Sequence, residues 1–206
     1  MTPEEAFAIY LNYSPELEFL NGGDSEDKAF TESMLAIVPD IADLEIFLDE
    51  ADNLYHLAAR GFFDQIVKPF ETELKVLLCD KYAVNTKRKT NKIDGDYYWR
   101  IKSKDGHSLF ELGFLFRAKK EKCIATPWFW RVGNGVKLTL EELEKKLKDK
   151  FSIPRSGNWR SGALVAKSVE YGSTDNIEQL NKNLMSPISF ALNKIVRHLE
   201  RQEKIS

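Results

Sequence analysis

The segment YYWRIKSKDGHSLFELGFLFR, from Tyr97 to Arg117, decides the fold. Its central Asp105-Gly106 pair lies between two runs in which apolar and polar side chains alternate. This combination is the strongest short-range signal of a β-hairpin, with the pair forming a two-residue turn. The segment therefore predicts two antiparallel strands, near residues 96–104 and 107–118.

The register of this hairpin divides its side chains between two faces. One face is apolar and is expected in the core; it consists of Tyr97, Trp99, Ile101, Phe110, Leu112, Phe114 and Phe116. The other face carries Tyr98, Arg100, Lys102, Glu111 and Arg117. Because Arg100 lies opposite Glu111, we expect the two to form a structural ion pair across the strands. Tyr98 is expected to cover Gly113, as aromatics often cover strand glycines.

A third strand is predicted near residues 123–133, where CIATPWFWRVGNG alternates again. A connection over residues 119–122 places Trp128 and Trp130 on the side of Arg100 and Lys102. One residue more or less places both tryptophans in the core, and the sequence leaves the two registers open. Pro127 has no N–H for a strand ladder, so it predicts an edge strand or a bulge.

The first 82 residues are predicted to be helical. Thr2-Pro3 and Ser14-Pro15 each combine an N-cap hydroxyl with proline at the first helical position, and a third short helix follows them. A longer helix runs from its cap at Asp40 to Gly61, a residue suited to the left-handed conformation that ends helices. Another helix covers about residues 63–82, with a bend at Pro69.

Loops and further elements follow from the same kinds of signal. Residues 85–92, NTKRKTNK, are predicted to form a loop because they hold four cations and no large apolar side chain. Thr139 and Glu142 form a capping box at the start of a helix. Residues 162–172 read as one strand, and a helix from Asp175 is predicted to break at Ser186-Pro187 before the last helix.

These elements indicate an α+β fold, in which an acidic helical N-terminal region packs with an antiparallel sheet of three to four strands and C-terminal helices. We divide the chain into a helical acidic region over residues 1–84 and an α+β region over residues 85–206. The 206 residues are enough for one compact unit with a substantial core.

Charge is distributed unevenly along the chain, although the net charge is only −2. Residues 1–56 contain 14 Asp and Glu against one Lys, and residues 57–206 contain 29 Lys and Arg against 18 acids. Such asymmetry favours either an interaction surface or mutual docking of the two parts.

Composition and motifs exclude several classes of protein. The chain is 43% apolar and 30% charged, which is typical of a folded protein. Its start is acidic, and no apolar run approaches the length of a membrane span, so we expect a cytoplasmic protein without a membrane partner. Cys79 and Cys123 form no metal or disulfide pattern, and the three histidines are far apart. We expect no cofactor and no metal.

The preferred function is a non-enzymatic inhibitor or adaptor that binds a protein partner through a charge-polarised surface. The outer face of the predicted helix after Asp40 carries the candidate partner-binding residues Asp43, Glu45, Asp49, Glu50 and Asp52. Spaced carboxylates of this kind present a negative surface to a basic partner, much as duplex phosphates do.

An alternative is a nucleic-acid-binding protein that uses the basic and aromatic sheet face. Residues 85–167 hold 20 Lys and Arg against 9 acids, interleaved with aromatics that could stack on bases. The candidate residues are Lys87, Arg88, Lys89, Arg100, Lys102, Trp128, Trp130, Trp159 and Arg160.

A divergent metal-dependent nuclease is a variant of this alternative. Asp94 or Asp96 with Glu111 would supply its carboxylates, and Lys102 or Lys119 its lysine. Glu111 is followed by Leu112 and Gly113, so the usual Glu-x-Lys pattern is missing. No catalytic residue can be named, and the sequence favours a non-enzymatic protein.

Overall fold

A computed structural model describes residues 1–11, 41–78, 81–88, 93, 95–119, 122–132, 136–154, 159, 161–171 and 177–203. For residues 41–48, 86–88, 118–119, 122 and 203 it describes the backbone alone. The helices are one over residues 3–11, α3 (Ile41–Phe62), the π-helix η1 (Phe63–Val67), α4 (Lys68–Leu78), α5 (Leu140–Leu147) and α6 (Ile177–Glu203). The strands are β1 (Ala83–Arg88), β2 (Gly95–Lys102), β3 (Ser108–Lys119), β4 (Lys122–Arg131), β5 (Phe151–Ser152), β6 (Ala163–Ala166) and β7 (Val169–Tyr171).

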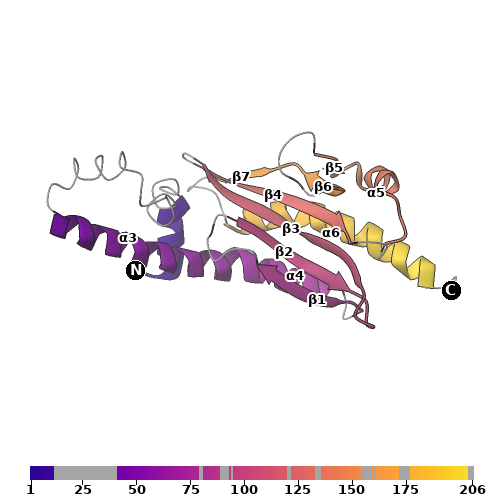
Figure 1. The fold of residues 1–206 in the computed structure, drawn as a ribbon, viewed down its shortest axis with the longest axis horizontal. Coiled ribbons are helices and arrows are strands. Elements are labelled where there is room, and N and C mark those ends of the chain that lie inside the picture. The colour runs from indigo at the N-terminus through magenta and orange to yellow at the C-terminus, as the bar shows by residue number, and fades with distance from the viewer. Residues whose placement is uncertain are drawn as a thin grey trace.

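The strands form one antiparallel sheet in the order β1-β2-β3-β4-β6-β5, with β7 also paired to β4 (Figure 1). The α+β class with an antiparallel sheet is therefore confirmed. The predicted three to four strands are wrong, because the described sheet has seven. Three causes account for the difference: β1 occupies the first half of the predicted loop over residues 85–92, the short strand β5 was not predicted, and the predicted strand over residues 162–172 is divided into β6 and β7.

One face of the sheet is covered by helices and forms the core. Phe70 of α4 stacks on Trp99 with ring centroids 4.6 Å apart, and α6 packs against both α4 and β4. The ring centroid of Phe62 lies 4.8 Å from that of Phe116 and 5.5 Å from that of Phe7 in the N-terminal helix. All seven apolar residues predicted for the core face of the hairpin are at most 2% exposed, so that prediction is confirmed.

The hairpin turn differs from the predicted two-residue turn. Ser103 accepts a hydrogen bond from Gly106 N and its own N donates to His107 O, so Lys104, Asp105 and Gly106 form a three-residue loop. Gly106 has φ +87°, which glycine adopts without the steric cost of a side chain. A one-residue register shift between Ile101 and Lys102 compensates for the longer loop. Arg100 consequently pairs with Glu111 as predicted.

The connection between β3 and β4 resolves the register that the sequence left open. Lys119 pairs with Lys122, which places Trp128 opposite Gly113 and Trp130 opposite Glu111. Both tryptophans therefore lie on the side of Arg100. Pro127 lies in a strand with neighbours on both sides, opposite the break between β6 and β7, where the pairing shifts by one residue. The proline thus marks an irregularity rather than an edge strand.

Two predicted helix ends are wrong. Gly61 does not end α3, which continues through η1 into α4. A Cβ at Gly61 would lie 2.0 Å from Pro3 O, so this glycine allows the N-terminal helix to approach closely. Ser186-Pro187 does not interrupt α6 either, because Pro187 lies inside a continuous helix and is buried. Tertiary packing overrides both local signals.

The predicted N-cap at Thr2 and the predicted capping box at Thr139 are both present, and Thr2 also forms a box of its own. Thr2 and Glu5 exchange backbone-to-side-chain hydrogen bonds, as do Thr139 and Glu142. The caps at Ser14-Pro15 and Asp40, and the third short helix, lie outside the described residues. The predicted boundary between residues 84 and 85 falls within β1.

A π-helical segment lies immediately before Pro69, the residue at which the sequence predicted a bend. Lys68 N donates to Phe63 O, a bond to the fifth residue back. Pro69 has no N–H to offer the Gln65 carbonyl four residues earlier, and Asn181 of α6 donates its Nδ2 to that oxygen at 2.8 Å. The side chain of α6 therefore satisfies an acceptor that the proline leaves without its helical donor.

Asn181→Ala is expected to lower the free energy of unfolding by about 1–2 kcal/mol, because the Gln65 carbonyl loses this donor in a partly buried site. Urea unfolding followed by circular dichroism measures the change. Asn183→Ala is the control on the same helix, since Asn183 is exposed and bonds to the exposed Gln179. Equal effects of the two substitutions would contradict the role given to Asn181.

Within the described residues, no helix combines the length and the apolar character needed to span a membrane.

Candidate functional site

The acidic residues of α3 lie on the part of the helix that precedes its main packing contacts. Figure 1 shows that the N-terminal part of α3 extends past the end of the sheet. Asp49, Glu50 and Asp52 of α3 are exposed. Asp43 and Glu45 belong to the same helix, but their side chains lie outside the described ones. From Tyr55 onward, regularly spaced side chains such as Phe62 and Phe70 are buried.

The charges of this stretch are largely unused within the described structure. Asp52 Oδ2 lies 3.2 Å from Nε2 of His56, and both side chains are more than half exposed. An exposed pair at this spacing contributes little stability. Asp49 and Glu50 form no hydrogen bond or ion pair with any residue that the structure describes.

Tyr55 anchors the helix immediately after this stretch. Its hydroxyl accepts a hydrogen bond from Ile93 N at 2.9 Å, and its ring lies 6.1 Å from that of Tyr10. The side chain is 3% exposed. Because α3 continues without a break into η1 and α4, the acidic stretch extends from a helix that is fixed at its other end.

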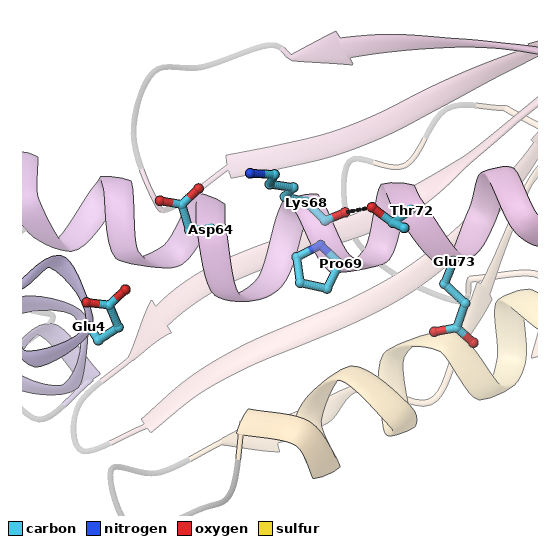
Figure 2. A pocket seen from close by; sticks show the side chains of 6 residues that line it. All are labelled: Glu4, Asp64, Lys68, Pro69, Thr72 and Glu73. Carbon is cyan, nitrogen blue, oxygen red and sulfur yellow. Dashed lines mark hydrogen bonds between the residues drawn. The ribbon is translucent and has the colours of Figure 1, made fainter.

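A groove of about 700 Å³ follows the same long helix further along, beside the N-terminal helix (Figure 2). Three carboxylates, from Glu4, Asp64 and Glu73, and the ammonium of Lys68 line it. Figure 2 shows Lys68 extending toward the side of Asp64, and Glu73 pointing away toward α6. The groove is wide open to solvent, whereas small-molecule sites are mostly concave and enclose much of their ligand. It does not suggest a ligand of one class.

The second sheet face holds the residues of the nucleic-acid alternative, and several of them interact with one another. Arg100 Nε donates to Glu111 Oε1 at 2.7 Å, and its Nη2 lies 2.5 Å from the same oxygen. Glu111 is fully buried, although it lies on the face opposite the aromatic core. The predicted ion pair between Arg100 and Glu111 is thus confirmed.

The two tryptophans of β4 are held by hydrogen bonds. Trp128 Nε1 donates to Asp96 Oδ1 at 2.9 Å, and Trp130 Nε1 donates to Ser161 O at 3.1 Å. Trp128 is 4% exposed, and its ring lies 5.8 Å from that of Tyr98. Base stacking needs an exposed aromatic ring, so Trp128 does not offer a stacking surface in this conformation.

The remaining candidates of the alternative are scattered. Lys102 and Trp159 are partly exposed. Lys87 and Arg88 belong to β1 with their side chains outside the described ones, and Lys89 and Arg160 lie outside the described residues altogether. The structure brings Arg100 and Trp130 to the same face, but it does not assemble a continuous described groove from the predicted set.

The described carboxylates that the nuclease hypothesis requires are engaged by other side chains. Asp96 accepts the Trp128 indole N–H, and Glu111 is paired with Arg100. Asp94 lies outside the described residues. Searching the described residues reveals no group of three or more His, Cys, Asp or Glu side chains that could hold a metal ion.

One charged cluster was missed from the sequence. Lys194, Arg197 and Arg201 of α6 line the same cleft as three lysines at the C-terminal end of α5 and just after it. Their spacing along α6 is that of one helix face, which was the available signal. The lysines near residue 146 were recognised from the sequence, but the second set of cations, almost 50 residues later on α6, was not.

Comparison with known proteins finds no matching family model, no matching curated protein and no matching solved structure.

Proposed function

We propose that this chain is a non-enzymatic inhibitor or adaptor that docks on a basic surface of a protein partner through the acidic stretch of α3. The observation that carries the proposal is the exposure of Asp49 and Glu50 without described partners, on a helix that extends past the sheet. Asp52 adds a third carboxylate that is only weakly engaged by His56.

The way in which α3 is anchored in the core supports this role. A rigid element that is already in its binding conformation loses little conformational entropy when it docks. The long helix is held by Tyr55, Phe62 and Phe70, so its exposed turns are presented in one orientation. Exposed carboxylates on such an element steer association with positively charged surfaces and repel polyanions. A basic protein therefore suits this surface better than a nucleic acid does.

The proposed location is the cytoplasm. Cys79 and Cys123 lie in unrelated segments of the sequence and make no disulfide pattern, which is typical of proteins in a compartment that keeps thiols reduced.

Reversing three charges tests the docking surface. We expect the variant with Asp49→Lys, Glu50→Lys and Asp52→Lys to lose affinity for the partner by at least about 30-fold, because attraction is replaced by repulsion. The partner is found by carbodiimide cross-linking in lysate of the cells that express the protein, followed by mass spectrometry. Carbodiimide joins carboxylates to lysines directly, so links from Asp49 or Glu50 identify the docking site. Binding of the purified partner then gives the affinity.

The control changes the net charge equally at other sites. Glu4→Lys, Glu73→Lys and Asp149→Lys alter three exposed acids outside α3, and this variant should bind within about two-fold of the wild type. Both variants should unfold at nearly the wild-type temperature, since exposed substitutions have small effects. Cross-links that avoid α3, an equal loss in the control variant, or a large loss of stability in the α3 variant would contradict the proposal.

A further inference from the structure

A positively charged cleft lies between α5, with the turn that follows it, and the C-terminal part of α6. Its volume is about 400 Å³, and it is partly enclosed. Six cations line it: Lys145, Lys146, Lys148, Lys194, Arg197 and Arg201. The single acid in the lining is Asp149. In Figure 1 this end of α6 lies at the opposite end of the molecule from the N-terminal part of α3.

Packing of the two helices brings these charges together. Leu143 and Leu147 turn one side of α5 into the core, and Ile195 and Leu199 do the same for α6. The two helices contact each other. Their polar sides consequently border the same cleft, although the two sets of cations are almost 50 residues apart in the sequence.

The six cations are not neutralised by described side chains. None of them forms a salt bridge with a residue that the structure describes, and Lys194 Nζ lies 5.4 Å from the centre of the Phe190 ring. Elsewhere in the fold, Lys75 and Lys81 do pair with carboxylates. Like charges held close together repel one another, and a bound anion would relieve that repulsion.

His198 provides a second, independent observation in the same cleft. It lines the cleft, and its buried Nε2 has no hydrogen-bond partner. Burial lowers the pKa of His198 below its ordinary 6.5, and the positive charges of Lys146 and Arg201 lower it further, whereas Glu142 acts in the opposite direction. Burial and the neighbouring cations thus both favour the neutral form of the imidazole.

We propose that this cleft binds a small ligand that carries two or more linked phosphate groups. Phosphate oxygens accept several charge-assisted hydrogen bonds, and Arg197 and Arg201 can each present two parallel donors to them. The volume is within the range of small-molecule sites. No Phe, Tyr or Trp is among the described residues that line the cleft, and the imidazole of His198 is partly buried, so recognition is expected to rest on the phosphates.

Titration calorimetry of the full chain with sodium tripolyphosphate tests the site. At about 0.1 M salt, where distant charges are screened, we expect one ligand per chain. The variant with Lys194→Gln, Arg197→Gln and Arg201→Gln should bind at least about 30-fold more weakly, since three charge-assisted contacts are lost. These side chains are exposed, so the variant should fold, and its melting temperature should not fall.

The control variant carries Lys104→Gln, Lys137→Gln and Lys182→Gln, three exposed cations outside the cleft. It has the same change in net charge and should keep its affinity within about two-fold. An equal loss in both variants would show general charge attraction and overturn the proposal, as would the absence of binding to tripolyphosphate.

Titrations with inorganic phosphate and with ATP distinguish the source of the phosphates. Binding of phosphate as tightly as tripolyphosphate would overturn the requirement for linked groups, and tight binding of ATP would support it.

Further measurements distinguish a phosphate ligand in the cleft from a nucleic acid or a second copy of the chain. Tripolyphosphate should raise the pKa of His198 in NMR titrations, because the anion offsets Lys146 and Arg201, while the imidazole signals of His56 and His107 stay unchanged. An unchanged His198 would contradict the site. Tighter binding of a single-stranded oligonucleotide than of tripolyphosphate would overturn the proposal in favour of nucleic acid. If the chain self-associates and tripolyphosphate does not reverse the association, the proposal is overturned, because the cleft would then bind the acidic helix of a second copy.

Discussion

Replacing Arg100 with methionine is expected to lower the free energy of unfolding by about 3–5 kcal/mol. Glu111 is fully buried, and Arg100 contributes two contacts to its Oε1, at 2.7 and 2.5 Å. Without the guanidinium, a carboxylate remains in a site that water does not reach. Urea unfolding at pH 7, followed by circular dichroism, measures the loss.

The double variant with Arg100→Met and Glu111→Met is the matched control for this prediction. Replacing both members of a buried pair by apolar side chains is often neutral or stabilising, because the desolvation cost disappears with the attraction. We therefore expect the double variant to be more stable than Arg100→Met alone. If the single variant is as stable as the wild type, Glu111 does not depend on Arg100, and the structural role given to this pair is wrong.

Gly113→Ala is expected to be the other severe substitution, with a loss of about 3 kcal/mol or more because the new methyl group overlaps backbone atoms. A Cβ at this position would lie 2.0 Å from Tyr97 O and 2.8 Å from Tyr98 Cα. These atoms belong to β2, so relief would require β2 and β3 to separate. The rings of Tyr98 and Trp128, which flank Gly113 in the sheet, lie 5.8 Å apart.

Gly106→Ala separates this clash from ordinary backbone strain. Gly106 has φ +87°, and a Cβ there meets no atom within 4 Å. The expected loss is only about 1–2 kcal/mol, the cost of a left-handed conformation for a residue with a side chain. Thermal unfolding of both variants checks the order. Similar losses for Gly106→Ala and Gly113→Ala would show that the contact with β2 is not the cause.

Several features of the fold follow from local patterns in the sequence. Alternation between Tyr97 and Phe116 predicted which side chains are buried, and the same alternation predicted the pairing of Arg100 with Glu111. The capping box of Thr139 was predicted in the same way. These signals depend on residues a few positions apart or on neighbouring strands of one hairpin, so they survive in any arrangement of the remaining chain.

Other features depend on packing between distant segments, and local patterns misread them. Gly61 is a residue type typical of helix ends, yet it lies inside a continuous helix, where the absence of a side chain allows Pro3 to approach its backbone. Residues 83–88 are too polar to suggest a strand, but the free edge of β2 supplies hydrogen bonds for one. Pro187 lies inside α6 and is buried together with Leu184 and Ile188, so the packing of this side of the helix outweighs the local helix-breaking signal.

Of the candidate surfaces, one could be predicted from the sequence, and the others could be assessed only from the tertiary structure. The acidic stretch of α3 was predicted from the sequence, because adjacent carboxylates on one helix need no tertiary contact to share a surface. The loss of Trp128 as an exposed stacking group required the structure, since its burial depends on β2, β3 and β6 together. The basic cleft also required it. Two sets of cations almost 50 residues apart border one cleft only after the apolar sides of α5 and α6 have packed into the core.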